Sequence, residues 1–303
     1  MKPQRGGSAG LERIAAVCSR DPWQLQADLH THSDHSDGTL APEVLAEHAS
    51  AAGVELFALT DHDAIHGQSI ARDAALAAGM AWVSGVEISV TWAARTIHVL
   101  GFGFDLRNSQ LGAALTSLRA GRLDRAKRID QQLAQAGLPG ALEGALTQVK
   151  DPAQVSRTHF ARWIAAQRGY TDTREVFAHY LCNGRPGDVA HPWARLRDAV
   201  GWIRHAGGMA VLAHPARYRL DGLLLDGLLR DFTEAGGAGI ESVSGSHSRQ
   251  EIRHWSSVAR QHRLRASRGS DFHGPHEGHA ALGALCLVPD AVEPLWSHWG
   301  TVD

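Results

Sequence analysis

Histidines and carboxylates occur in this chain at spacings that suit a shared cation. Residues 28–32 read DLHTH, which places His30 and His32 two positions apart. In an extended strand such residues lie on the same face. Asp37 follows in a polar turn rich in Ser, Asp and Gly. The HxH pattern taken alone is equally compatible with two surface histidines or two satisfied core histidines.

Later apolar runs carry the same residue types. The run ELFALTDHD over 55–63 ends in Asp61, His62 and Asp63, while Glu87 and His98 lie within AWVSGVEIS and TIHVLGF. A carboxylate inside an apolar run needs a cation or a hydrogen-bonded partner. Other interpretations are helix capping by Asp61 or Asp63, a buried ion pair at Glu87 and a satisfied core histidine at His98.

Two further runs, MAVLAHP and RASRGSDFH, end in His214 and in the pair Asp271 and His273. The candidate metal ligands, all at or near predicted strand ends, are His30, His32, Asp37, His62, Glu87, His98, His214, Asp271 and His273. The carboxyl ends of the strands of a parallel barrel converge, so these residues can meet.

The number of candidate ligands exceeds what one tetrahedral zinc needs, so we expect two or three divalent cations, bridged by Glu87 or by a hydroxide. Imidazole and carboxylate ligands without cysteine favour manganese, iron or zinc over a thiolate site, and ligand type alone does not choose between these metals. We expect manganese, with iron, zinc or magnesium as alternatives. Such a cluster hydrolyses esters with a metal-bound hydroxide as nucleophile. The expected catalytic residues are Asp37, His62, Glu87 and His273.

The elements that must position these residues alternate between β-type and helical segments, which favours βαβ units and a mainly parallel sheet. We expect a loose extension or surface helix over 1–24, a barrel domain from 25–104 and 189–303, and a helical insertion over 105–188. After the insertion the spacing predicts helices around 223–236 and 249–262, and a last β-type run, ALCLVP, over 284–289.

Composition narrows the function further. The 32 acidic and 30 basic residues nearly cancel, so there is no global basic field for long nucleic acid. The odd, widely spaced cysteines Cys18, Cys182 and Cys286 favour a reducing compartment, and we expect a cytoplasmic protein. The sequence has no signal-peptide pattern and no apolar stretch of roughly 18 residues. We therefore expect neither secretion nor membrane insertion. No obligate protein partner is evident.

The segments DLHTHSDHSDGT, ALTDHD, GVEIS, IHVLGF, VLAHP and GSDFH together resemble the PHP (polymerase and histidinol phosphatase) family, from about Gln26 to Pro289. The resemblance implies an α/β fold, a distorted (β/α)7 TIM-like barrel with a helical insertion. It also implies a trinuclear metal site built from the nine candidate ligands.

Within that family, the segments LPGALEGA, GRLDRAKR, RTHFARW and HAGGMAVLAHPARY resemble bacterial 3′,5′-nucleoside bisphosphate phosphatases, also described as 5′-3′ exoribonucleases. This resemblance implies removal of the 3′-phosphate from substrates such as adenosine 3′,5′-bisphosphate, leaving the 5′-monophosphate. It implies short 5′-phosphorylated RNA as a second substrate.

A second phosphate needs a cation besides the metals. Arg122 and Arg125 lie three apart on one predicted helix, and Arg157 opens RTHFAR, so these guanidiniums can grip it. The alternative is a solvated helix face. His159 is a fourth candidate substrate-binding residue, as a contact, a proton donor to the leaving hydroxyl or a structural histidine.

Two other functions fit the metal motifs. One is a small phosphomonoesterase that resembles histidinol phosphatase. The other, of a different class, is a non-catalytic metal-binding regulatory module, against which the intact ligand set argues.

Overall fold

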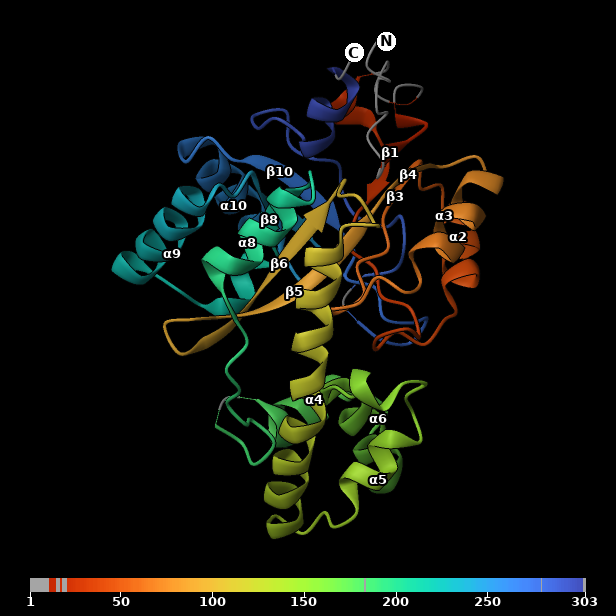
Figure 1. The fold of residues 1–303 in the computed structure, drawn as a ribbon, viewed down its shortest axis with the longest axis vertical. Helices are drawn as coiled ribbons and strands as arrows, with labels where there is room; N and C mark the ends of the chain where they lie inside the picture. Colours follow the sequence, from red (N-terminus) through yellow and green to blue (C-terminus); the bar gives the residue numbers. More distant parts are fainter. Residues whose placement is uncertain (1–10, 15–16, 18–20, 183, 279, 302–303) are drawn as a thin grey trace.

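The computed structural model describes residues 11–14, 17, 21–182, 184–278 and 280–301 (Figure 1). Much of the predicted N-terminal extension over 1–24, Cys18 included, lies outside the described residues. Within it, Leu11 and Glu12 form strand β1 and pair with Val83 and Trp82 of strand β4. This part of the predicted extension therefore contributes an edge strand to a sheet.

Strands and helices alternate over most of the chain, as the sequence predicts. The strands are β1 Leu11–Glu12, β2 Ala27–Asp28, β3 Leu56–Phe57, β4 Ala81–Val83, β5 Gly85–Trp92, β6 Arg95–Phe102, β7 Ala194–Arg195, β8 Met209–Leu212, β9 Gly239–Ser244 and β10 Arg265–Gly269. The α-helices are α2 Pro42–Ala51, α3 Gln68–Ala77, α4 Ser109–Gln135, α5 Ala141–Leu146, α6 Arg157–Arg168, α7 Thr173–Val176, α8 Leu196–His205, α9 Gly222–Ala235 and α10 Arg249–Gln261. Short helical turns are η1 Pro22–Gln24, η2 Pro152–Gln154, η3 Phe177–Leu181, η4 Pro215–Tyr218 and η5 Leu295–Thr301.

The described strands form two sheets, ordered β1-β4-β3-β2 and β10-β9-β8-β6-β5-β7. Backbone hydrogen bonds join the sheets at both edges. On one side Leu29 N–H donates to Arg268 O (3.0 Å), and on the other Asp63 N–H donates to Glu87 O (2.8 Å). This mixed α/β arrangement agrees with the predicted distorted barrel, although the ladders remain two separate sheets.

The second sheet is less parallel than predicted. Strand β6 runs antiparallel to both of its neighbours, β5 and β8. Only Ala93 and Ala94 separate β5 from β6, and both have positive φ (46° and 59°). A parallel connection needs a crossover of about a dozen residues, so this short link forces a hairpin. Glu87 and His98 consequently lie inside strands, whereas the other predicted ligands follow strand ends or lie in loops.

The predicted β-type run over 284–289 is wrong, because the structure has no strand there. The free edge of β10 is already used: Arg268 O accepts from Leu29 N–H, and Ala266 N–H donates to Glu293 O (2.8 Å). Leu285 O instead accepts from the Arg268 guanidinium (2.6 Å). The segment is therefore held by a side chain rather than by a ladder.

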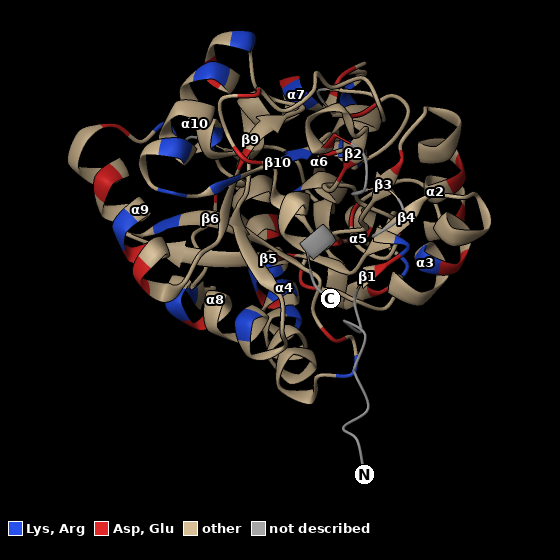
Figure 2. Ribbon diagram, turned by 90° about the horizontal axis from the view of Figure 1, so that it is seen from above, with Lys and Arg blue, Asp and Glu red and all other residues tan. Residues whose placement is uncertain are grey.

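The helices between β6 and β7 pack around an apolar cluster of their own, which includes Ile129, Leu133, Phe160 and Ile164. Figure 1 shows α4 running away from the sheets, with α5 and α6 beside its far half. In the view of Figure 2, acidic and basic residues are interspersed over the outer helices, in keeping with the near-zero net charge. None of the described helices combines the length and apolar content needed to cross a bilayer.

Gly269, at the end of β10, allows the two sheets to approach closely. A Cβ at this position would lie 2.2 Å from His30 Cβ and 2.7 Å from Glu241 Oε1. We predict that Gly269→Ala lowers the free energy of unfolding by about 1–3 kcal/mol through overpacking. The matched change Gly112→Ala, in a helix with nothing within 4 Å of the added Cβ, should raise it by about 0.5–1 kcal/mol. Chemical denaturation measures both, and equal effects would contradict the packing argument.

Candidate metal centre

The Glu87 carboxylate lies at the centre of a cluster of imidazoles. It projects from the interior of β5 and is fully buried. Its Oε1 is 2.8 Å from His98 Nδ1 and 3.0 Å from His214 Nε2. Its Oε2 is 3.0 Å from His62 Nδ1 and 3.3 Å from both His30 Nε2 and His32 Nε2. One carboxylate thus faces five histidines from four different segments of the chain, since His30 and His32 share one.

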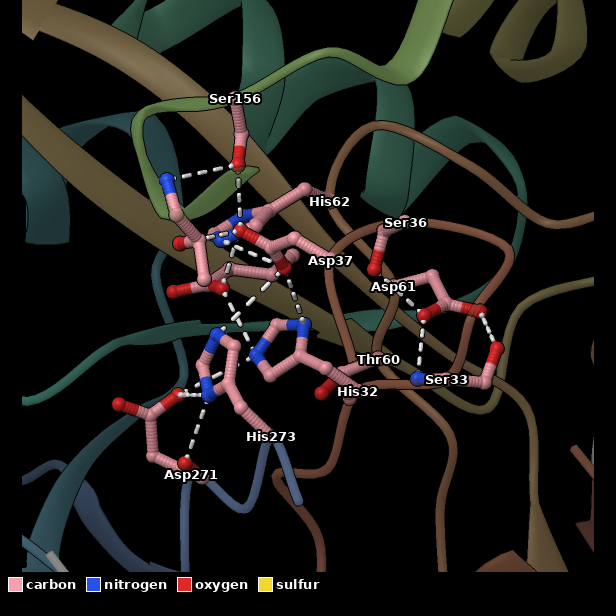
Figure 3. A network of polar contacts seen from close by, with 12 residues as sticks. His32, Ser33, Ser36, Asp37, Thr60, Asp61, His62, Ser156, Asp271 and His273 are labelled. Atoms are coloured by element: carbon pink, nitrogen blue, oxygen red, sulfur yellow. Dashed lines mark hydrogen bonds and ion pairs between the residues drawn. The ribbon is translucent and has the colours of Figure 1, made fainter. Parts of the chain in front are cut away.

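Two aspartates flank this centre. Asp37 Oδ1 lies 3.4 Å from His273 Nε2 and 3.8 Å from His62 Nε2 (Figure 3). Asp271 Oδ1 lies 3.2 Å from His32 Nε2 and 3.3 Å from His30 Nε2. The two aspartates therefore face different ring nitrogens of His32, Asp37 near Nδ1 (3.9 Å) and Asp271 near Nε2.

All nine residues that the sequence predicts as metal ligands come together here. Ligand atoms within 4.8 Å of one another form three groups, and His214 joins through its contact with Glu87. The groups are His32, Asp37, His62 and His273; His30, His32, Glu87 and Asp271; and His62, Glu87 and His98. His32, His62 and Glu87 belong to two groups each, an arrangement suited to neighbouring cations.

The imidazoles differ in how readily they take a proton. Burial lowers the pKa of His32 to about 3, and the adjacent His273 acts in the same direction. For His273, burial also lowers the pKa, but Asp37 and Asp271 outweigh burial and raise it to about 9. Burial raises the pKa of Glu87, yet His62 and His98 hold it well below the ordinary value. A charged Glu87 beside a neutral His32 is the state in which both groups bind cations, whereas His273 would release its proton on binding one.

Several buried polar atoms of the cluster have no hydrogen-bond partner among the described residues. They are His30 Nε2, His32 Nδ1, Asp37 Oδ1, His62 Nδ1, Glu87 Oε2 and His214 Nδ1. Buried polar atoms are normally paired, because leaving one unpaired costs about 1–3 kcal/mol. All six atoms belong to ligand types for divalent transition metals, so the residues present fit a metal cluster.

A second layer of groups holds these side chains, and sequence reasoning missed its main member, Glu241. The Glu241 carboxylate contacts His30 Nδ1 (2.9 Å) and accepts from His214 N–H (2.6 Å). Arg217 also belongs to this layer and contacts Asp271 Oδ2 (2.5 Å). The signal for Glu241 was available, since a glutamate within the apolar run GIESVS repeats the pattern at Glu87.

Asp61 and Asp63, for which helix capping was one interpretation, have other roles. Asp61 accepts hydrogen bonds from Ser33 N–H (2.8 Å), Ser33 Oγ (2.7 Å) and Ser36 Oγ (2.6 Å), which fixes the loop that leads to Asp37 (Figure 3). Asp63 accepts from Ser89 N–H (2.8 Å) and forms an ion pair with Arg122. Both aspartates therefore shape the surroundings of the cluster.

The three arginines predicted to bind substrate line one pocket. Arg122, Arg125 and Arg157 share it with Ser156 and Trp193. Burial lowers the pKa of Arg125 to about 9, and the neighbouring Arg157 and Arg122 contribute in the same direction. Three guanidiniums in one partly buried pocket repel one another, and a bound anion would relieve this repulsion. They are not a solvated helix face, because Arg122 and Arg125 are buried.

His159, the fourth predicted substrate-binding residue, is buried in the first turn of α6. Its Nδ1 accepts a hydrogen bond from Ser156 N–H (3.0 Å), forming a capping box with the Ser156 side chain. Burial lowers the pKa of His159 to about 4, with Arg162 and Arg122 contributing. The described contacts therefore give this histidine a structural role in the helix cap.

Comparison with known proteins agrees with this geometry. The family model for the PHP domain matches residues 28–181. The 3′,5′-nucleoside bisphosphate phosphatase of Chromobacterium violaceum is 45% identical over 269 residues, which cover 89% of this chain and 94% of that protein. The chain belongs to the PHP family.

Other PHP relatives and solved structures extend the comparison. The 5′-3′ exoribonuclease Rnm of Escherichia coli is 38% identical, covering 90% of this chain and 93% of that protein. An amidohydrolase structure from Chromobacterium violaceum, with bound sulfate, superposes with a TM-score of 0.86 at 44% identity and covers 90% of this chain and 95% of that one. The structure of a proposed metal-dependent phosphoesterase from Bifidobacterium adolescentis gives a TM-score of 0.78 at 27% identity, covering 89% and 94%.

Glu241 offers a test of the second layer. In Glu241→Gln, an amide N–H₂ would face either His30 or the His214 N–H, so one contact is lost together with the negative charge. We predict that Mn²⁺ affinity, measured by isothermal titration calorimetry, falls on the order of 10- to 100-fold. Glu251→Gln, in the capping box of α10, is the matched control. Unchanged affinity in Glu241→Gln would show that Glu241 does not support the centre.

Proposed function

We propose that this protein is a metal-dependent phosphoesterase that removes the 3′-phosphate of nucleoside 3′,5′-bisphosphates, such as adenosine 3′,5′-bisphosphate, and leaves the 5′-monophosphate. One observation carries the proposal: the histidine–carboxylate cluster and the arginine pocket adjoin. Ser156 lines the pocket and its Oγ donates to Asp37 Oδ2 (2.9 Å). A substrate with two phosphates needs two such neighbouring sites.

The proposed ligands are the nine residues of the cluster, and Mn²⁺ is the proposed metal. When bound, divalent cations lower the pKa of a coordinated water and neutralise charge on phosphoryl oxygens. The side chains of His30 and His32 are fully buried, whereas His62, His98 and His273 keep 13%, 20% and 16% exposure. The last three mark the open side of the centre, from which a substrate can approach.

Within this centre we assign catalytic roles to Asp37, His62, Glu87 and His273. Glu87 faces both the buried and the open histidines, so it is the candidate bridge between cations. His62 and His273 both lie beside Asp37 Oδ1 on the open side. These groups would orient the phosphate that is cleaved.

The arginine pocket is the proposed site for the 5′-phosphate that is retained. Arg125 donates through Nε to Val189 O (3.0 Å), and Arg157 donates through Nη1 to Leu181 O (3.1 Å). These bonds fix the two side chains while leaving other N–H groups for a phosphate. Arg122 already pairs with Asp63, so it supplies less free charge. We propose residues 105–188 as a cap domain that selects the substrate.

A second proposed activity is 5′-3′ cleavage of short 5′-phosphorylated RNA, by analogy with the exoribonuclease relatives. The near-zero net charge supports short substrates, because long RNA calls for more phosphate contacts.

The widely spaced cysteines support the cytoplasm as the proposed location.

The test is phosphate release by Mn²⁺-loaded protein from adenosine 3′,5′-bisphosphate, with adenosine 3′-monophosphate, adenosine 5′-monophosphate and histidinol phosphate in parallel. We expect release from the bisphosphate, abolished by His32→Ala. Arg125→Ala should raise KM by about 10- to 100-fold with little change in kcat, because it removes a charge-assisted phosphate contact. Arg174→Ala, on exposed α7, is the control and should match the wild type. Faster release from histidinol phosphate would overturn the substrate assignment.

A further inference from the structure

The first turn of helix α6 reaches from the insertion to Asp37 in the cluster. Ser156 Oγ and Thr158 Oγ1 each donate a hydrogen bond to Asp37 Oδ2 at 2.9 Å. Arg162, one turn further along, donates through Nη2 to the backbone Asp37 O (2.5 Å). Figure 3 shows Ser156 descending from the ribbon of the insertion onto the Asp37 carboxylate.

These contacts divide the two oxygens of Asp37 between different tasks. Oδ2 receives both hydroxyl hydrogen bonds, whereas Oδ1 has no hydrogen-bond partner and lies beside His273, His62 and His32 at 3.4, 3.8 and 3.9 Å. A carboxylate held through one oxygen presents the other in a fixed direction. Hydrogen bonds of this kind orient metal ligands and raise metal affinity.

The first turn of α6, which contacts Asp37, is itself held in place by two sets of contacts. Ser156 and His159 form the capping box of α6. Arg162 also makes a two-pronged ion pair with Glu277, with Nε–Oε1 and Nη2–Oε2 distances of 2.7 Å. Glu277 lies shortly after His273, so α6 ties together the two segments that supply Asp37 and His273.

We propose that Ser156 and Thr158 are positioning residues for Asp37, so that the helical insertion completes the metal centre as well as lining the arginine pocket. This inference rests on the proposed function, since it takes Asp37 as a metal ligand. Ser156 and Arg157 are adjacent and both line the pocket. One turn of helix therefore serves the retained phosphate and the Asp37 side of the cluster.

The test is a Mn²⁺ titration of the full chain carrying Thr158→Val or Ser156→Ala. The free ion is measured by electron paramagnetic resonance. Each variant removes one hydroxyl donor to Oδ2. We expect the weakest-bound ion to lose affinity on the order of 10- to 100-fold, while the tighter ions remain. Thr158→Ser keeps the hydroxyl and should bind Mn²⁺ like the wild type.

The matched control is Ser248→Ala, which removes the capping-box serine of α10, a helix whose cap makes no contact with Asp37 among the described residues. It should match the wild type in Mn²⁺ binding. If Thr158→Val and Ser156→Ala bind every ion as the wild type does, the inference is wrong. The two proposals can also fail separately. If these variants bind Mn²⁺ more weakly but the wild type releases no phosphate, the positioning role stands and the proposed function is wrong.

Discussion

The buried negative charge of Glu87 constrains the rest of the structure. A carboxylate at zero exposure on the central part of β5 is stable only if positive charge or hydrogen-bond donors surround it. Five histidines converge on it. Burial lowers the pKa of His32 and His214, whereas neighbouring carboxylates outweigh burial and raise the pKa of His30 and His62. Protons on histidine offset this charge in one way, and cations bound by neutral imidazoles would offset it in another.

The two sheets provide the convergence that this charge requires. Residues 29–32 and 61–63 extend β2 and β3 toward the second sheet and hydrogen-bond to the segment after β10 and to β5. Glu241 then holds His30, and Asp61 holds the loop that leads to Asp37. The insertion closes the remaining side through α6. Its hydroxyls contact Asp37 while its arginines form the neighbouring pocket, so the histidine–carboxylate cluster and the arginine pocket share one wall.

Much of this could be predicted from residue types and spacing. HxH on an extended segment, polar residues closing apolar runs, a glutamate and a histidine inside such runs and an aspartate in the turn after HxH are local signals. Together they pointed to all nine clustered residues. The hairpin between β5 and β6 was harder, because both strands read as ordinary apolar runs and only the two-residue link distinguishes them. The absence of a strand at 284–289 depends on which groups occupy the edge of β10. The contacts of Ser156 and Thr158 join residues 119 and 121 positions apart from Asp37, a relation set by packing of the insertion.

The measurement that most directly tests the central claim is anomalous X-ray diffraction at the manganese edge, on crystals of the full chain grown with Mn²⁺. The account predicts two or three anomalous peaks within the cluster, with the Glu87 carboxylate between neighbouring peaks and Asp37 Oδ1 directed at one of them. A map without anomalous peaks in the cluster, in which the histidines donate hydrogen bonds directly to Glu87, would contradict this account.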